Sequence, residues 1–261
     1  MSTNRKRRNL KMENLFDYIS SKTYPGRGIV VFHPKETSTL LCAYWIMGRS
    51  ENSRNRVFEE VSSENSSRFS IRTVAADETK IEDPHLIIYN VRLSIDEKNI
   101  VIITNGDQTD TIAKFVENGN DEKVAFMQAL ETRTFEDDSP NFTPRISVMV
   151  NAKNGNVSFS SLQCSDVEKQ TTARNFSFYD QVSEGQGYLL TTYVDDGNPL
   201  PSGSLSPIKI RCESQNSQDF IDNIWKSLND DNKISLYLEE IDLNNGNSKC
   251  KLVNKYKRLE A

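Results

Sequence analysis

Nine consecutive residues, Gly48–Arg56, concentrate side chains that bind anions. The run reads Gly-Arg-Ser-Glu-Asn-Ser-Arg-Asn-Arg and directly follows the apolar stretch Leu40–Met47. Arginine forks match the geometry of phosphate and carboxylate groups, and ligands often bind where a packed strand ends. We therefore expect an anion site at the end of a buried strand. A solvated basic loop is the alternative interpretation.

A second arginine is presented between two glycines in the segment Tyr24–Gly28, whose sequence is Tyr-Pro-Gly-Arg-Gly. Glycine lets the backbone approach a ligand closely, so Arg27 is a candidate ligand contact. An ordinary tight turn with a surface arginine explains the same residues equally well.

Polar side chains also follow two other apolar stretches. Tyr89 and Asn90 end one of them, and Asn105 and Asp107 follow the other, just before a predicted helix. A tyrosine that faces a pocket can transfer protons, and free amides at a helix start can face a polar ligand. A core tyrosine and a helix cap are the structural alternatives, and both are common.

An acidic run, Phe135–Asp138, precedes a segment that ends in Arg145. Such runs are usually solvated loops. Glu136 can act as a general acid or base only if the fold brings it into the same pocket as the arginines.

Several types of site are disfavoured by residue usage. The chain has two histidines, His33 and His85, which both adjoin prolines in predicted loops, and it has no nucleophile elbow for a Ser-His-Asp triad. Its four cysteines form no C-x-x-C pair, so no zinc site is expected. We predict no metal site.

The net charge of −5 argues against a broad nucleic-acid surface. The basic residues near the start, Asn4–Arg8, are best interpreted as part of a disordered, solvated tail over residues 1–11. No apolar stretch resembles a signal peptide or a membrane span. We therefore expect a cytoplasmic protein without a membrane or nucleic-acid partner.

Apolar periodicity and turn residues predict the elements that position these side chains. Residues 51–70 are expected to form loop and edge structure. Helices are predicted at 12–22, 109–117, 121–132 and 218–228. Strands are predicted at 29–32, 40–47, 86–89, 99–104, 146–152, 157–162, 187–193, 234–243 and 248–256. Consecutive strands separated by helical pairs indicate an α+β fold with antiparallel sheets, in a single domain over residues 12–261.

Five motifs occur in a set order along the chain. They are Tyr-Pro-Gly-Arg-Gly at 24–28, the arginine-rich run at 48–56, Tyr-Asn-x-Arg at 89–92, Thr-Asn-Gly-Asp-Gln-Thr-Asp at 104–110 and Thr-Pro-Arg at 143–145. This set resembles the archaeal-type inosine monophosphate cyclohydrolase family, and most closely its bacterial cyclohydrolase-like branch. The resemblance covers nearly the whole chain.

The resemblance implies an N-terminal-nucleophile-hydrolase-like fold, a four-layer αββα sandwich of two mainly antiparallel sheets. It also implies closure of the second purine ring, in which 5-formamidoimidazole-4-carboxamide ribonucleotide becomes inosine monophosphate and water. The family reaction needs no metal and no organic cofactor. A purine ribonucleotide is thus the expected partner, and the resemblance suggests a homo-oligomer.

Matched motif by motif, the family's active-site residues fall on Tyr89, Arg56 and Glu136. The implied roles are proton transfer by Tyr89 and Glu136, and stabilisation of the developing oxyanion by Arg56. The predicted substrate contacts are Arg27, Arg49, Asn90, Asn105, Asp107 and Arg145.

The chain departs from the archaeal pattern at Gln108, where that motif has histidine, and in an extended loop at 57–80. Such changes can alter the substrate. Two other functions therefore stay open: a nucleotide-binding regulatory protein that has lost turnover, and an amidohydrolase that acts on another small substrate.

Overall fold

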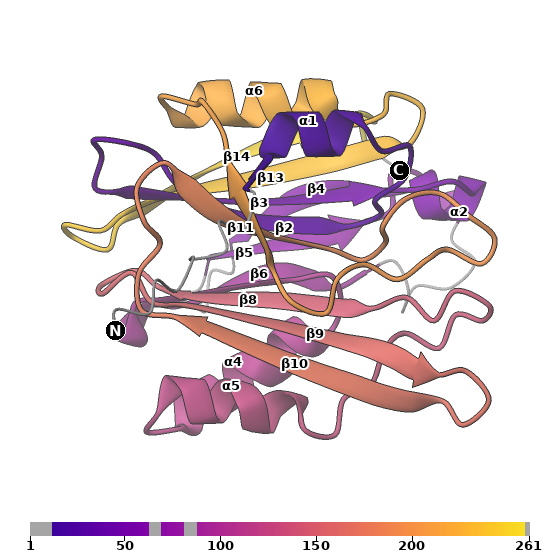
Figure 1. The fold of residues 1–261 in the computed structure, drawn as a ribbon, viewed down its shortest axis with the longest axis horizontal. Coiled ribbons are helices and arrows are strands. Elements are labelled where there is room, and N and C mark those ends of the chain that lie inside the picture. The colour runs from indigo at the N-terminus through magenta and orange to yellow at the C-terminus, as the bar shows by residue number, and fades with distance from the viewer. Residues whose placement is uncertain (1–11, 63–68, 81–87, 259–261) are drawn as a thin grey trace, which may run out of the picture.

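Two seven-stranded sheets stack face to face, and helices cover their outer faces (Figure 1). The computed structural model describes residues 12–62, 69–80 and 88–258. The predicted basic tail, residues 1–11, lies outside them. The arrangement confirms the predicted α+β fold with mainly antiparallel sheets.

The first sheet has the strand order β1-β12-β11-β2-β3-β13-β14. Every neighbouring pair is antiparallel except β1 and β12, which are parallel. The strands are β1 (Glu13–Asn14), β2 (Gly28–His33), β3 (Thr39–Met47), β11 (Gln186–Thr191), β12 (Ile208–Arg211), β13 (Lys233–Asp242) and β14 (Ser248–Asn254).

The second sheet is antiparallel throughout and has the order β10-β9-β8-β7-β6-β5-β4. Its strands are β4 (Val57–Ser62), β5 (Phe69–Val74), β6 (Asn90–Ile95), β7 (Ile100–Thr104), β8 (Arg145–Asn151), β9 (Val157–Asp166) and β10 (Thr171–Tyr179).

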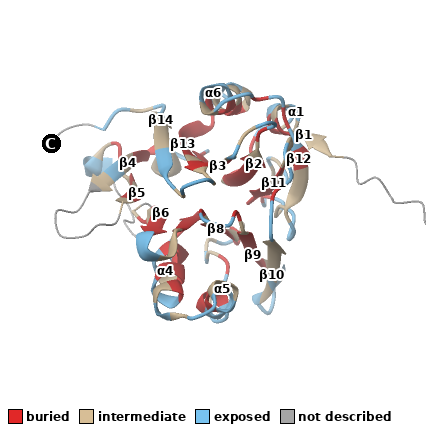
Figure 2. Ribbon diagram, turned by 90° about the vertical axis from the view of Figure 1, so that its left-hand side faces the viewer, coloured by how far each residue is buried: buried red, intermediate tan, exposed pale blue. Residues whose placement is uncertain are grey.

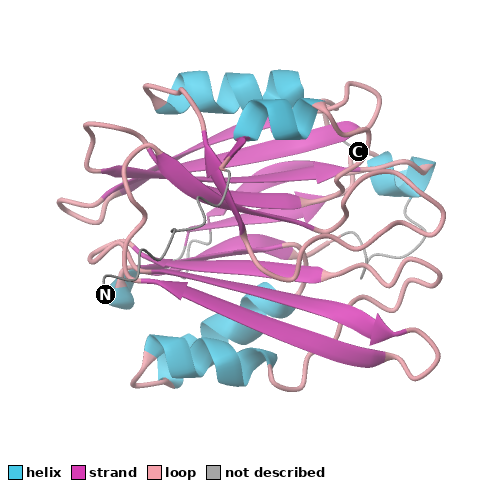
Figure 3. Cartoon of the chain, viewed as in Figure 1, coloured by secondary structure: helices cyan, strands magenta, loops and turns pink. Residues whose placement is uncertain are grey.

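Helices complete the outer layers (Figure 3). The first sheet is covered by α1 (Leu15–Ser20) and α6 (Ser217–Ser227), and the second by α4 (Gln108–Asn118) and α5 (Glu122–Leu130). The short helix α2 (Glu51–Arg54) follows β3 at one end of the sandwich. Two 3-10 turns, η1 (Glu78–Lys80) and η2 (Asp96–Lys98), lie in connections.

Alternation along β3 explains why its sequence is apolar without interruption. Tyr44 and Ile46 pack between the two sheets, whereas Trp45 and Met47 pack against α1 and α6. Successive strand residues face opposite sides of a sheet, so a strand buried on both faces needs apolar residues at every position. Buried residues accordingly occupy both the space between the sheets and the space beneath the helices (Figure 2).

A charged cluster joins the two sheets inside this core. Arg92 of β6 donates to both carboxylate oxygens of Glu239 on β13, at 3.0 and 2.5 Å, and the two side chains are 3% and 1% exposed. The hydroxyls of Tyr237 and Ser248 also donate to Glu239. Burial acts to lower the pKa of Arg92, but the Glu239 carboxylate outweighs it and raises that pKa. With two hydrogen bonds from Arg92 and one each from Tyr237 and Ser248, the Glu239 carboxylate has four donors.

Most predicted elements are confirmed within one to three residues. Residues 51–70 were expected to form loop and edge structure; β4 is indeed the edge strand of the second sheet, but the helix α2 and the start of β5 were not predicted there. No strand was predicted at the positions of β1, β5, β6, β10 and β12. The side chains of β10 are exposed or only partly buried, and β12 is only four residues long. Of the predicted strand at 86–89, residues 86 and 87 lie outside the described residues, and residues 88 and 89 precede β6, which begins at Asn90.

Removing one charge of the buried pair should destabilise the fold strongly. We expect Glu239→Gln to lower the free energy of unfolding by about 3–5 kcal/mol, because it leaves the Arg92 cation buried without compensation. Adding Arg92→Met to Glu239→Gln should recover part of that loss. Urea denaturation measures both, with Glu51→Gln in the exposed Lys80–Glu51 pair as the control that changes little. A double variant less stable than Glu239→Gln would contradict this role.

Candidate active site

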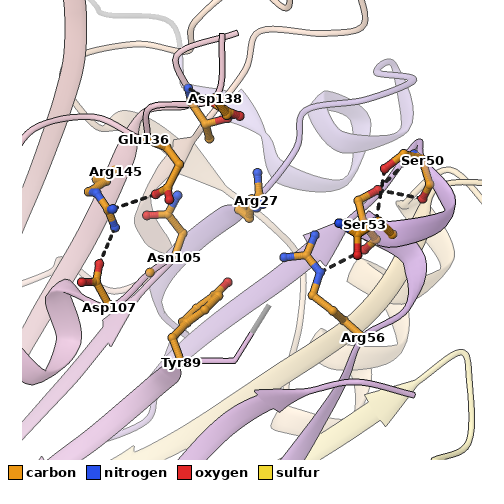
Figure 4. A pocket seen from close by; sticks show the side chains of 13 residues that line it. Arg27, Ser50, Ser53, Arg56, Tyr89, Asn105, Asp107, Glu136, Asp138 and Arg145 are labelled. Carbon is orange, nitrogen blue, oxygen red and sulfur yellow. Dashed lines mark hydrogen bonds and ion pairs between the residues drawn. The ribbon is translucent and has the colours of Figure 1, made fainter. Parts of the chain in front are cut away.

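A pocket of about 220 Å³ opens at one end of the sandwich, close to α2 (Figure 4). It gathers residues that directly precede β2 and β6, residues that follow β3 and β7, and the segment that leads into the start of β8. Its lining consists of Arg27, Ser50, Asn52, Ser53, Arg56, Tyr89, Asn105, Gly106, Asp107, Glu136, Asp138, Thr143 and Arg145. Seven of the nine sequence-predicted site residues lie in this set.

Arg56 is held in place by the short helix α2, which follows the apolar strand β3. Ser50 caps α2 by accepting from the Ser53 amide, and the Ser53 side chain accepts from Ser50 in return. The Arg56 Nε donates to the Ser53 carbonyl at 2.9 Å, and the residue is 2% exposed. The capped turn thus anchors Nε and leaves the terminal nitrogens of Arg56 directed into the pocket.

Arg27 enters the pocket from the start of β2. Its Nε is buried and has no hydrogen-bond partner among the described residues. The flanking glycines make room for the protein's own side chains: a Cβ at Gly28 would lie 2.0 Å from the Trp45 ring, and Gly26 has a φ of +71°. The expected close approach of this backbone to a ligand is therefore replaced by close packing.

The two guanidinium groups influence each other, and neither forms an ion pair with a carboxylate in the described part of the chain. Burial lowers the pKa of Arg56, and the charge of Arg27 lowers it further. Burial also opposes the charged form of Arg27, but its pKa is raised by the oxygens of Tyr24, Tyr44, Tyr89 and Tyr193. Two close cations without a counterion form a site that an anion would stabilise.

Tyr89 is fixed at the floor of the pocket by β5. Its backbone NH donates to the Thr73 hydroxyl at 3.1 Å, and its carbonyl accepts from the Thr73 NH at 3.0 Å. Tyr89 is 7% exposed, and its hydroxyl points toward the space below Arg27 (Figure 4). The hydroxyl can therefore reach a ligand that also contacts the arginines.

The opposite wall carries carboxylates that are already paired. Arg145 contacts Glu136 and Asp107, each at 2.8 Å, and donates to Gln108 at 2.9 Å. Asp107 also pairs with Arg133. Burial would raise the pKa of Asp107, but the two arginines lower it overall. Arg145 therefore lines the pocket, as predicted for a substrate contact, but its guanidinium already binds three side chains of the protein.

A closed turn holds Glu136 in place. The Asp138 carboxylate accepts from both the backbone NH and the hydroxyl of Thr143, at 2.6 and 2.5 Å. The Thr143 carbonyl in turn accepts from the Glu136 NH at 2.9 Å. The Thr143 hydroxyl also forms a hydrogen bond with Tyr193. The backbone of the candidate proton acceptor is thus tied to the pocket wall.

Asn105 and Gln108 build the corner between β7 and α4. The Asn105 side chain donates to the Pro144 carbonyl at 2.8 Å and accepts from Ile146 NH and Gln108 Nε2. The Asn105 amide is thus used largely within the protein. At Gly106 a Cβ would lie 2.5 Å from the Arg145 guanidinium, so a larger residue there would have to displace that side chain.

Two predicted substrate contacts do not line the pocket. Arg49 forms an ion pair with Asp196, donates to the Gly197 carbonyl at 2.9 Å and lies over the Tyr24 ring. Asn90 donates to Asp110 at 2.8 Å. Both side chains have partners outside the pocket lining.

Sequence reasoning did not assign a role to several lining residues. Ser50, Asn52 and Ser53 belong to the quoted arginine-rich run, and Asp138 belongs to the acidic run, so their positions gave a signal that was not used. Thr143 lies in the Thr-Pro-Arg motif, but its link to Asp138 depends on the turn between them.

Among the described residues, no group of three or more His, Cys, Asp or Glu side chains is arranged to hold a metal ion. In the same part of the chain, no helix is both long enough and apolar enough to cross a membrane.

Comparison with known proteins adds a family assignment to this geometry. A search of the curated proteins found no significant match. The family described as IMP cyclohydrolase-like protein matches residues 24–246, which include every residue that lines the pocket. The chain therefore belongs to the IMP cyclohydrolase-like protein family.

Proposed function

We propose that this protein closes the purine ring, converting 5-formamidoimidazole-4-carboxamide ribonucleotide to inosine monophosphate and water. The main support is a single pocket that combines a tyrosine hydroxyl, a glutamate and two arginines that pair with no carboxylate of the described residues. The proposal includes a single domain over residues 12–261 with an N-terminal-nucleophile-hydrolase-like fold. Membership of the family is consistent with this reaction.

The first step forms the new ring bond. The carboxamide nitrogen attacks the formyl carbon, and the electron pair of the formyl C=O bond moves to its oxygen. Glu136 takes one proton from the attacking nitrogen, and Tyr89 gives its proton to the formyl oxygen. The product of this step is a cyclic carbinolamine. Holding both reacting groups within one bound molecule lowers the entropic part of the barrier.

The second step expels water. The carbon–oxygen bond breaks, and the hydroxyl group leaves with the proton that Glu136 now carries. The former formamide nitrogen loses its proton to the Tyr89 oxygen, and the C=N bond of the purine forms. Both side chains thereby return to their starting protonation states, so one turnover releases one water and consumes no other reactant.

The two arginines differ in exposure, and this suggests a division of roles. Arg56 is 2% exposed, and electrostatic stabilisation of an oxyanion is strongest where water is excluded. Arg27 is partly exposed and has an unpartnered Nε, which suits the 5′-phosphate. The buried Asn52 Oδ1 has no hydrogen-bond partner in the described part of the chain either, and it can accept a hydrogen bond from a ribose hydroxyl.

Replacing Tyr89 by phenylalanine should slow ring closure without changing the shape of the pocket. We expect Tyr89→Phe to lower kcat by about 10²- to 10⁴-fold, the usual contribution of a positioned proton donor. A spectroscopic assay of the purified protein follows conversion of the formamido precursor.

Tyr188→Phe is the matched control, since Tyr188 is half-buried, stacks on Tyr179 and lies outside the pocket lining. Its kcat should match that of the wild type. Full activity in folded Tyr89→Phe would rule out the proposed role of Tyr89. Binding of inosine monophosphate by a wild type that never turns over the precursor would rule out the enzymatic function.

The arginine roles predict different kinetic effects. Arg27→Met should raise KM by about 10- to 100-fold, because a hydrogen bond to a charged group is worth about 1.5–3 kcal/mol. Arg56→Met should instead lower kcat by about 10²- to 10³-fold, the usual cost of losing an oxyanion donor. Steady-state kinetics separate the two effects.

The riboside that lacks the 5′-phosphate provides a second comparison. Wild type and Arg27→Met should process it with similar kcat/KM, because the contact removed by the substitution has no phosphate to bind. Arg258→Met, which alters a surface ion pair with Glu59, controls for general loss of positive charge. An equal KM defect with ribonucleotide and riboside would show that Arg27 does not bind the phosphate.

A further inference from the structure

A second tyrosine reaches the proposed proton donor from the other sheet. Tyr44 of β3 belongs to the first sheet, and its hydroxyl lies 3.3 Å from the Tyr89 hydroxyl, next to β6 of the second sheet. Tyr44 is completely buried, and its ring stacks on Phe58 with 5.6 Å between centroids. Within the described residues, the Tyr44 hydroxyl forms no other hydrogen bond.

Burial determines which hydroxyl donates in this pair. A buried hydroxyl that donates to nothing incurs the cost of desolvation, and Tyr44 has only the Tyr89 oxygen to donate to. Tyr44 is therefore the donor and Tyr89 the acceptor. The Tyr89 hydroxyl faces the pocket (Figure 4), so Tyr89 can then donate its own hydrogen to a substrate bound there.

We infer that Tyr44 is a positioning residue, whose donated hydrogen bond orients the Tyr89 hydroxyl and stabilises its oxygen when Tyr89 has given up its proton. This inference rests on the proposed function, because it takes Tyr89 as the proton donor in ring closure. When the Tyr89 O–H bond breaks, the electron pair stays on the Tyr89 oxygen and the proton moves to the formyl oxygen. Tyr44 keeps its own proton throughout.

The surroundings of the pair agree with this direction of donation. Burial raises the pKa of Tyr44 well above its ordinary value, and the neighbouring Tyr89 raises it further. Tyr44 thus stays protonated and able to donate. The separation of 3.3 Å is long for two hydroxyls, but a bond to a charged oxygen is shorter and stronger.

Charged groups face the two tyrosines from several elements. Arg27 comes from the residue just before β2 and Arg56 from the segment after α2, and both place positive charge near the two tyrosines. The opposite wall contributes Glu136, Asp138 and Arg145, of which Glu136 and Arg145 form an ion pair. Tyr44 differs from the two arginines because it donates a hydrogen bond without adding charge.

The fold provides a matched comparison residue. Tyr237 of β13 lies directly opposite Tyr44 in the strand register and is also completely buried. Its hydroxyl donates to Glu239, inside the charged cluster that joins the sheets. Removing either hydroxyl takes one buried hydrogen bond from the same core, but among the described residues the bond of Tyr44 is to Tyr89 and that of Tyr237 is to Glu239.

The test compares Tyr44→Phe with Tyr237→Phe in the full chain. Tyr44→Phe should lower kcat about tenfold, keep KM within about twofold, and move the alkaline limb of the kcat–pH profile to higher pH. Tyr237→Phe should lower the free energy of unfolding but leave kcat and its pH profile unchanged. An unchanged kcat and pH profile in folded Tyr44→Phe would overturn the inference.

Tyrosine ring ¹³C NMR gives a readout that does not depend on turnover. The Tyr89 signal should titrate at higher pH in Tyr44→Phe than in the wild type, and an identical titration would overturn the inference. If Tyr44→Phe does not fold, the Tyr44 signal in Tyr89→Phe answers the same question, since loss of its acceptor should shift that signal. A wild type without turnover but with these NMR shifts would reject the proposed reaction and leave the coupled pair established.

Discussion

The repulsion between the Arg27 and Arg56 guanidinium groups is the constraint on which the site depends. Both groups lie in one pocket, and no carboxylate of the described residues pairs with either. On the opposite wall Glu136 and Asp107 both pair with Arg145, and Asp138 accepts from the NH and hydroxyl of Thr143. The described fold therefore holds two cations without a carboxylate partner in one pocket, and the proposed ribonucleotide would bring balancing charge on its phosphate.

Close to Tyr89 in sequence, the core also contains an arginine whose charge is fully paired. Arg92 follows Tyr89 by three positions and pairs completely with Glu239, which also accepts from two hydroxyls. One end of this segment is thus fixed between the sheets by a satisfied ion pair, and the other end presents Tyr89 to the unbalanced arginines. A rigid, fully bonded interior next to an unsatisfied site is the arrangement that preorganised electrostatic catalysis requires.

Sequence patterns predicted the strands and helices that are rich in apolar residues. The strand at 40–47 was predicted because every position in it is apolar. The helix at 218–228 was predicted because one of its faces is apolar. The edge strand β10 was missed because its side chains are only partly buried, so it lacks the alternation of a core strand. In the site, motif order identified Tyr89, Arg56 and Glu136, which do share a pocket. It could not exclude Arg49, whose partner Asp196 is distant in sequence.

The structure of the protein bound to inosine monophosphate tests the proposed site most directly. The proposed mechanism predicts the phosphate within about 3 Å of Arg27, and the six-membered ring of the purine between the Tyr89 hydroxyl, Arg56 and Glu136. A nucleotide bound outside this pocket, or one whose phosphate contacts Arg145 instead of Arg27, would contradict it.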